Sequence, residues 1–395
     1  MRAWHFSEQS YAPAWDKAEP MKITIPSELF DPETASNLLN RHLDEWIVAD
    51  ELGLDIMVNE HHSTLSCMSP SPTLPLAILA RETRNARLLA LGIPLGNRPD
   101  PFRIAEEIAL VDLISRGRME MGFVKGSGWE IFSSNLNPAR FMDRFWESHD
   151  LILKALTTLD GPFSWEGEFF QYRYVNVQPR CYQQPHPPIW MTSTSPWGAG
   201  PIGAKGYVMA SPMVGEFVKH AYDAYKAEYL KAHGHQASND RLAYLALVAV
   251  GNSEKEARVR AEKVKEHLRT QMSINPAFVN PPGYANVAGN VQGMRAAQRG
   301  PGLGRTLDGK GLDFTASIDE LGEAGVLFWG TPDQVYDQIE SFYHRVGGFG
   351  HMMMEAQAGH LTYNETVNSL SLFSEEVLPR LQELSATHAL EEQAI

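Results

Sequence analysis

The sequence has very few cysteines, and this scarcity excludes several classes of protein. Only Cys67 and Cys181 occur among 395 residues. They cannot form a disulfide framework, and neither has a C-x-x-C neighbour for metal or redox chemistry. Fourteen histidines are present, but there is no H-E-x-x-H motif and no His-x-His pair on a predicted strand, which argues against a zinc hydrolase. We therefore expect no metal site.

Basic residues and long apolar segments are also scarce. The 34 Lys and Arg residues are outnumbered by 48 Asp and Glu, which gives a formal net charge of −14. This charge disfavours nucleic-acid and membrane-surface partners, because both require basic patches. The longest apolar segments, at about ten residues, are too short to span a bilayer, and residues 1–10 contain no apolar run of signal-peptide length. We expect a cytoplasmic protein.

The common nucleotide-binding motifs are incomplete. Residues 304–311 approach the phosphate-loop pattern, but Gly311 stands where a Ser or Thr should bind magnesium. Gly122, Gly126 and Gly128 do not have the spacing of the dinucleotide fingerprint, and that fingerprint is not found elsewhere in the chain. The sequence therefore indicates no nicotinamide site of its own.

What the chain does contain is a regular alternation of strand-like and helix-like segments. The strand-like segments are 2–8, 55–60, 87–95, 119–124, 188–194, 206–211, 242–251 and 351–356, and order also returns at 326–329. Helical periodicity is clear at 34–52, where Leu39, Leu43, Trp46 and Ile47 share one stripe. Such alternation predicts an α/β fold with a parallel sheet, and close to eight units favour a closed (β/α)₈ TIM barrel over an open sheet.

Two segments interrupt this rhythm. Residues 161–187 are aromatic and proline-containing, which predicts a hairpin or a long loop. Residues 275–310 are rich in Gly, Pro, Asn and Gln, and a long irregular segment of this kind is either a functional lid or disordered. We therefore predict one domain, residues 1–384, with the 275–310 insertion after the seventh strand and a tail at 385–395.

The first candidate site follows the second strand. Glu60, His61 and His62 lie where that strand ends, and the chemistry of (β/α)₈ barrels occurs at the carboxyl ends of the strands. An imidazole titrates near neutral pH, so it can transfer protons. The alternative is structural, with one histidine merely satisfying a buried carboxylate.

The second candidate site is distributed over neighbouring strand ends. Its members offer positive charge, hydroxyls or closely approachable amides: Lys125, Gly126, Arg140, Thr192, Ser193 and Thr194. Together they suit a monophosphate. Each also has a structural explanation on its own: Lys125 as a surface lysine, Arg140 paired with Asp143 or Glu147, and Ser193 as a helix cap.

Several of these motifs resemble the bacterial luciferase-like flavin monooxygenases. They are Glu60-His61-His62, Ser69-Pro70, Ala105-Glu106-Glu107, the run 111–118, Gly122 and Gly330-Thr331-Pro332. The resemblance covers essentially the whole chain outside 275–310, and its most specific part is 101–126. It implies a (β/α)₈ barrel that binds FMN at the carboxyl rim.

The resemblance also implies roles for individual residues. The family's catalytic histidine falls on His61, its phosphate-binding arginines on Lys125 and Arg140, and its phosphate-binding serine on Ser193. Lysine keeps the charge of arginine but not its bidentate geometry. Pro196 stands in place of the luciferase threonine and Val124 in place of its reactive cysteine, which weakens the case for luminescence.

The implied function is a two-component monooxygenase. A separate NAD(P)H:flavin reductase would supply reduced FMN, and dioxygen would oxidise a small apolar aldehyde, ketone, terpene-like or aromatic substrate. We expect Trp129, Phe132, Trp190 and Trp197 to exclude water at the catalytic rim and the protein to form a homodimer. Either Glu60 or, equally, the backbone would orient His61, since neighbouring residues on a strand face apart. Two alternatives remain open: a deazaflavin-dependent oxidoreductase that transfers hydride without oxygen, and a flavin-binding protein without turnover.

Overall fold

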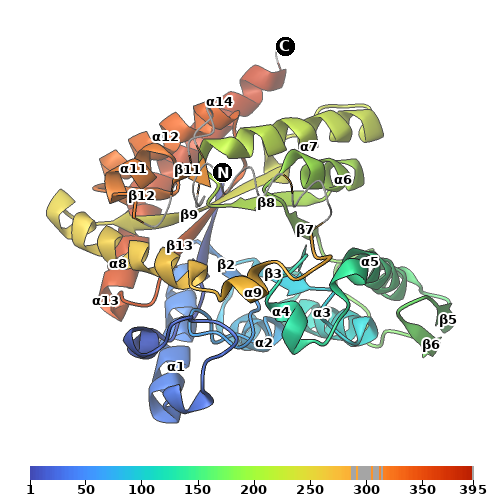
Figure 1. The fold of residues 1–395 in the computed structure, drawn as a ribbon. Helices are drawn as coiled ribbons and strands as arrows, with labels where there is room; N and C mark the ends of the chain where they lie inside the picture. The colour runs from blue at the N-terminus through green and yellow to red at the C-terminus, as the bar shows by residue number, and fades with distance from the viewer. Residues whose placement is uncertain (286–290, 292–303, 306–310, 313–314, 394–395) are drawn as a thin grey trace.

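The chain forms a closed barrel of parallel strands (Figure 1). The computed structural model describes residues 1–285, 291, 304–305, 311–312 and 315–393. The barrel strands are β1 (Arg2–Ser7), β2 (Asp55–Val58), β3 (Leu88–Pro94), β4 (Met119–Val124), β7 (Ile189–Thr192), β8 (Val208–Pro212), β9 (Leu242–Val250) and β13 (His351–Gln357). They pair in chain order, and β13 pairs back onto β1. The predicted (β/α)₈ barrel is confirmed.

One further parallel strand, β12 (Leu327–Gly330), belongs to the same sheet but not to the ring. It pairs with Leu247–Val250, the half of β9 that lies beyond the pairing with β8. This strand accounts for the order that the sequence shows at 326–329.

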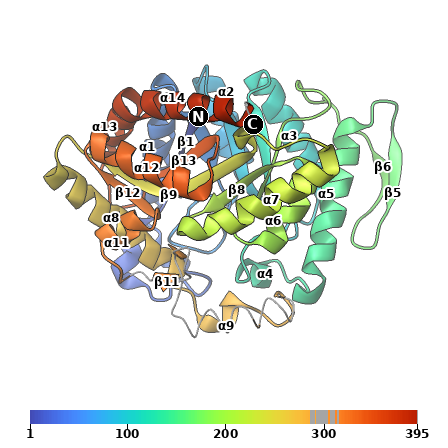
Figure 2. The same ribbon diagram turned by 90° about the horizontal axis from the view of Figure 1, so that it is seen from above.

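Most of the helices surround the barrel on its outer face (Figure 1), and two short ones, at Glu130–Ser133 and Pro276–Val279, lie beyond one end of it (Figure 2). The described helices are α1 (Pro32–Glu51), α2 (Thr73–Glu82), α3 (Pro101–Ser115), α4 (Glu130–Ser133), α5 (Phe141–Thr157), α6 (Pro196–Lys205), α7 (Val218–His233), α8 (Glu254–Met272), α9 (Pro276–Val279), α11 (Ile318–Glu323), α12 (Pro332–Val346), α13 (Tyr363–Leu372) and α14 (Leu378–Gln393). Three of them begin with a side-chain cap followed by proline, with Asp31, Asp100 and Ser195 as the capping residues. The capping side chain accepts a hydrogen bond from a first-turn amide that has no partner within the helix. The proline fixes the backbone φ of the first helical residue at a helical value.

Large apolar side chains fill the barrel interior. Trp4, Phe6, Leu245 and Met353 pack in one buried cluster that also contains Trp190. The Trp190 indole donates a hydrogen bond to Glu120, the second residue of β4. Since Trp190 is the second residue of β7, it lies in the amino-terminal half of the barrel, and its predicted place at the catalytic rim is wrong.

The two interruptions differ in how far the structure describes them. Residues 161–187 contain the antiparallel hairpin of β5 (Phe163–Glu166) and β6 (Gln171–Val175), as predicted. In the 275–310 segment, residues 275–285 are described, whereas most of the proposed lid lies outside the described residues. The closing helix α14 continues to Gln393, well past the predicted end at 384. Each helix in the described part of the chain is too short or too polar to span a bilayer.

Candidate functional site

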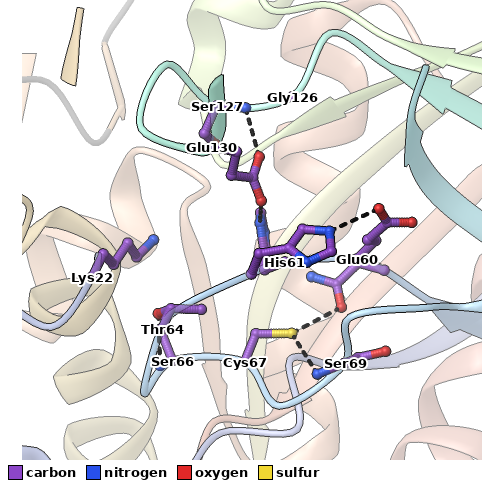
Figure 3. Close-up of polar contacts among 12 residues, drawn as sticks. Lys22, Glu60, His61, Thr64, Ser66, Cys67, Ser69, Gly126, Ser127 and Glu130 are labelled. Carbon is purple, nitrogen blue, oxygen red and sulfur yellow. Dashed lines mark hydrogen bonds and ion pairs between the residues drawn. The ribbon is translucent and has the colours of Figure 1, made fainter. Parts of the chain in front are cut away.

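A buried carboxylate holds the predicted catalytic histidine in place. His61 follows β2 at the carboxyl end of the barrel, and its Nδ1 lies 2.9 Å from Glu130 Oε1. The other Glu130 oxygen accepts a hydrogen bond from the Ser127 amide at 2.8 Å (Figure 3). Glu130 is fully buried at the start of α4. The carboxylate therefore fixes the ring of His61 and leaves its Nε2 for other partners.

The orienting residue is not the one that the sequence suggested. Glu60 contacts His62 Nε2 at 3.0 Å and Arg98 at 2.7 Å instead of His61. Within the described part of the chain, neither predicted alternative, Glu60 or the backbone, contacts His61 Nδ1. The side chain of Glu130 does so, and successive residues at a strand end point in different directions. Glu130 lies 69 residues from His61 in sequence, so no local spacing could have identified it.

The pKa values of this pair shift in opposite directions. Burial by itself lowers the pKa of His61, but Glu130 and Glu8 outweigh it and raise that pKa. Burial by itself raises the pKa of Glu130, but the charge of His61 and its hydrogen bond outweigh it and lower that pKa. Both shifts favour an imidazolium–carboxylate pair.

Replacing Glu130 with glutamine is expected to lower the pKa of His61, because the carboxylate that stabilises its charged form is lost. The raised pKa of His61 adds stability that is complete below its ordinary value of 6.5 and is lost as pH rises through the folded value. The lowered pKa of Glu130 adds stability that is complete above 4.5 and is lost as pH falls through the folded value. The pair therefore contributes most between those two ordinary values.

NMR of isotope-labelled histidine measures this shift, with the His61 signal assigned from its loss in a His61→Gln variant. Glu60→Gln is the matched control, since Glu60 does not contact His61. An unchanged pKa of His61 in Glu130→Gln would contradict the pairing.

A second group of buried ionisable side chains lies beside this pair. Glu8 after β1, His267 on α8 and Glu355 on β13 place one donor atom each within 4.8 Å of the others. His267 Nε2 is 2.8 Å from Glu355 Oε1. Burial alone would lower the pKa of His267, but Glu355 raises it. These donors could hold a metal ion, so the absence of a metal remains a prediction. The three come from distant elements, and no sequence motif links them.

Lys22 supplies a buried positive charge at the edge of this group. Its Nζ donates to Gln271 Oε1 at 2.8 Å and lies 5.2 Å from the Trp129 ring centroid. Burial lowers the pKa of Lys22, while the charges of Glu8 and Glu130 oppose that shift. Lys22 could not be assigned from sequence, because nothing distinguishes it there from a surface lysine.

A cavity of about 540 Å³ opens between the ends of β4 and β7. Four of the predicted cofactor-binding residues line it: Lys125, Thr192, Ser193 and Thr194. The remaining lining is largely apolar and aromatic, with Trp146, Trp197 and Tyr284 among its members, and none of the described lining residues is acidic. A hollow with one cation, several hydroxyls and no carboxylate suits an anionic group joined to a flat apolar one.

The described part of the 275–310 segment closes one side of this cavity. Lys125 Nζ donates to the Tyr284 carbonyl at 3.0 Å and lies 3.5 Å from the centroid of its ring. The Tyr284 hydroxyl donates in turn to the Gly126 carbonyl at 2.6 Å. Gly126 has a φ of +80°, a conformation that glycine adopts readily. Burial lowers the pKa of Lys125.

The side of the cavity that contains Ser193 and Ser195 is formed by the amino-terminal end of α6. The Ser195 hydroxyl accepts from the Gly198 amide at 3.3 Å and caps α6, while the Ser193 hydroxyl donates to the Ser195 carbonyl at 3.0 Å. A Cβ on Gly198 would lie 2.5 Å from Ser193 Oγ, so glycine is needed here for the start of α6 to pack against the Ser193 hydroxyl. The amino end of a ten-residue helix adds partial positive charge.

Arg140 does not belong to the described residues that line the cavity. Its exposed guanidinium binds Asp143 Oδ2 and Glu168 Oε2, each at 2.8 Å. The structure thus brings together Lys125, Gly126 and residues 192–194 but not Arg140, whose phosphate role remains a prediction.

Comparison with known proteins places the barrel in a family. The 3,6-diketocamphane 1,6-monooxygenase of Pseudomonas putida is 24% identical over 396 residues, covering 89% of this chain and 97% of that protein. The oxygenase component of a flavin-dependent trigonelline monooxygenase from Acinetobacter baylyi is 30% identical over 170 residues, but these cover only 42% of this chain and 46% of that protein.

Solved structures agree on the fold. The oxygenating constituent of the Pseudomonas putida 3,6-diketocamphane monooxygenase, in complex with FMN, matches with a TM-score of 0.70 at 20% identity over 96% of this chain and 98% of that one. A coenzyme F420-dependent reductase of Methanopyrus kandleri matches with a TM-score of 0.60 at 20% identity over 86% of this chain and 94% of that one. The sequence pattern of the luciferase-like monooxygenases matches residues 21–348, and the chain belongs to that family.

Proposed function

We propose that the protein is the oxygenase of a two-component system that uses reduced FMN and dioxygen to oxidise a small organic molecule. The cavity with one cation and no acidic lining, at the same barrel rim as His61, carries this proposal. Two relatives support it: one is named as an oxygenase component, and another was solved with FMN. A separate NAD(P)H:flavin reductase would then supply the reduced cofactor.

The residues present fit FMN. Lys125 offers a half-buried charge to the phosphate, and Ser193, Thr194 and the first amides of α6 offer hydrogen bonds. Lys125 now donates to the Tyr284 carbonyl, so phosphate would replace or join that acceptor. Reduced flavin, when bound, supplies the electrons that activate dioxygen.

The protein's own side chains would orient the His61 ring, exclude water from it and move a proton. Glu130 holds His61 by Nδ1, which leaves Nε2 to give or accept a proton at the barrel mouth. Trp129, which is buried, packs with its ring centroid 5.8 Å from that of His61 and keeps water from one side of the imidazole. We propose an aldehyde, ketone, terpene-like or aromatic substrate.

Rapid mixing tests the proposal. The anaerobic complex of the protein with reduced FMN is mixed with oxygenated buffer, and the visible absorbance of oxidised flavin is followed. We expect this absorbance to return much more slowly than for free reduced FMN, because a site that oxygenates its substrate must protect the activated cofactor from water. Reoxidation at the rate of free flavin would refute the monooxygenase. Tight binding of a deazaflavin, with hydride transfer and no oxygen uptake, would establish the alternative chemistry.

A further inference from the structure

The side of His61 opposite Glu130 faces a second carboxylate. His61 Nε2 lies 3.9 Å from Glu8 Oε2, which is too far for a direct hydrogen bond. The gap does allow one polar atom to lie within hydrogen-bond distance of both. Glu8 Oε2 is buried and has no hydrogen-bond partner among the described residues. Burying a carboxylate oxygen without a hydrogen-bond partner costs free energy. A ligand that donates a hydrogen bond to this atom would therefore be stabilised.

The two residues are held firmly but are not equally accessible. The side chain of Glu8 is 9% exposed and that of His61 is 21% exposed, so a ligand reaches the gap from the His61 side. Each is followed closely by a non-glycine residue in the left-handed region, Gln9 with a φ of 54° and Ser63 with a φ of 51°. Backbone strain of this kind is common where a fold fixes functional side chains.

We propose that Glu8 and His61 form a subsite for a hydroxyl group of the substrate, a proposal that rests on the proposed monooxygenase function. With Nδ1 bound to Glu130, a protonated His61 presents an N–H at Nε2. A hydroxyl accepts from that N–H and donates to the Glu8 carboxylate at the same time. A carbonyl or ether oxygen only accepts, and an ammonium only donates, so neither satisfies both partners.

The Glu8 carboxylate lies among other buried ionisable side chains. Lys22 and His267 are basic side chains that interact with Glu8, and Glu130 and Glu355 are other buried acidic side chains nearby. The subsite narrows the expected substrate from any small apolar molecule to one with an alcohol or phenol hydroxyl on an apolar frame.

Phenol and toluene test this subsite, because they match in shape and differ by one hydroxyl. Equilibrium dialysis of the full chain, with and without oxidised FMN, measures the affinity of each. We expect the wild-type protein to prefer phenol on the order of tenfold or more, as for a hydrogen bond to a charged group. Glu8→Met fills the same space without a carboxylate acceptor and should lower the preference most, since only the His61 N–H then remains to bind the hydroxyl. Glu8→Gln keeps a neutral acceptor and should reduce it, and this variant decides the matter if Glu8→Met does not fold.

His62→Gln is the control, since His62 contacts Glu60 and not Glu8, and it should keep the preference. Equal binding of phenol and toluene by the wild-type protein would overturn the proposal, and so would an unchanged preference in both Glu8 variants. A loss of FMN affinity in Glu8→Gln as large as the loss for phenol would assign the gap to the cofactor and also overturn it. A phenol preference that depends on Glu8 in a protein that binds no FMN would refute the proposed function while leaving the subsite in place.

Discussion

His61→Ala is expected to lower product formation by roughly 100-fold or more, the size of a general acid–base contribution, with little change in FMN affinity. His61 is the imidazole whose Nδ1 is fixed by a buried carboxylate and whose Nε2 lies 3.9 Å from Glu8 Oε2. Its removal deletes the proton carrier but none of the residues that line the cavity at β4 and β7. Product yield with a saturating supply of reduced FMN and equilibrium titration with FMN measure the two effects separately.

The adjacent histidine provides the control for this experiment. His62→Ala should retain most of the product yield, because the His62 ring is bound to Glu60 and not to Glu130. A His61→Ala variant with wild-type yield would remove His61 from the mechanism. If FMN affinity falls together with yield, His61 is a cofactor ligand and not a proton carrier.

Lys125→Ala is expected to weaken FMN by roughly 10- to 100-fold, the range for one hydrogen bond to a charged group, and to leave riboflavin binding nearly unchanged. Riboflavin lacks the phosphate, so the comparison isolates the charge interaction. Lys125 is the cation among the described residues that line the cavity. Fluorescence titration with both flavins measures the difference, and equal weakening of the two would refute the phosphate assignment.

Arg140→Ala tests the second predicted phosphate ligand. The exposed guanidinium of Arg140 is already bound to Asp143 and Glu168, and exposed ion pairs contribute little to binding or stability. We expect its replacement to weaken FMN less than Lys125→Ala does. A larger FMN-specific loss in Arg140→Ala would show that Arg140 leaves its acidic partners when the phosphate binds.

The architecture could be predicted because its signals are local. Apolar runs of strand length, helical stripes and prolines at helix starts depend on neighbouring residues, and they located the barrel strands to within a few residues. The strand β12, which lies outside the ring, and the continuation of α14 to Gln393 were not assigned from sequence. Both depend on tertiary pairing or packing and not on local pattern.

The sequence by itself determined the barrel, the rim position of His61, and the residues at the carboxyl ends of β4 and β7 that line the cavity. Strand ends of a parallel barrel converge on one face, so residues that follow predicted strands must meet there. Only the tertiary structure decided that Glu130 and not Glu60 orients His61, that Glu8 faces the other ring nitrogen, and that Arg140 pairs with Asp143 and Glu168. These choices depend on side-chain direction at loop turns and on contacts between residues far apart in the chain, which no sequence spacing encodes.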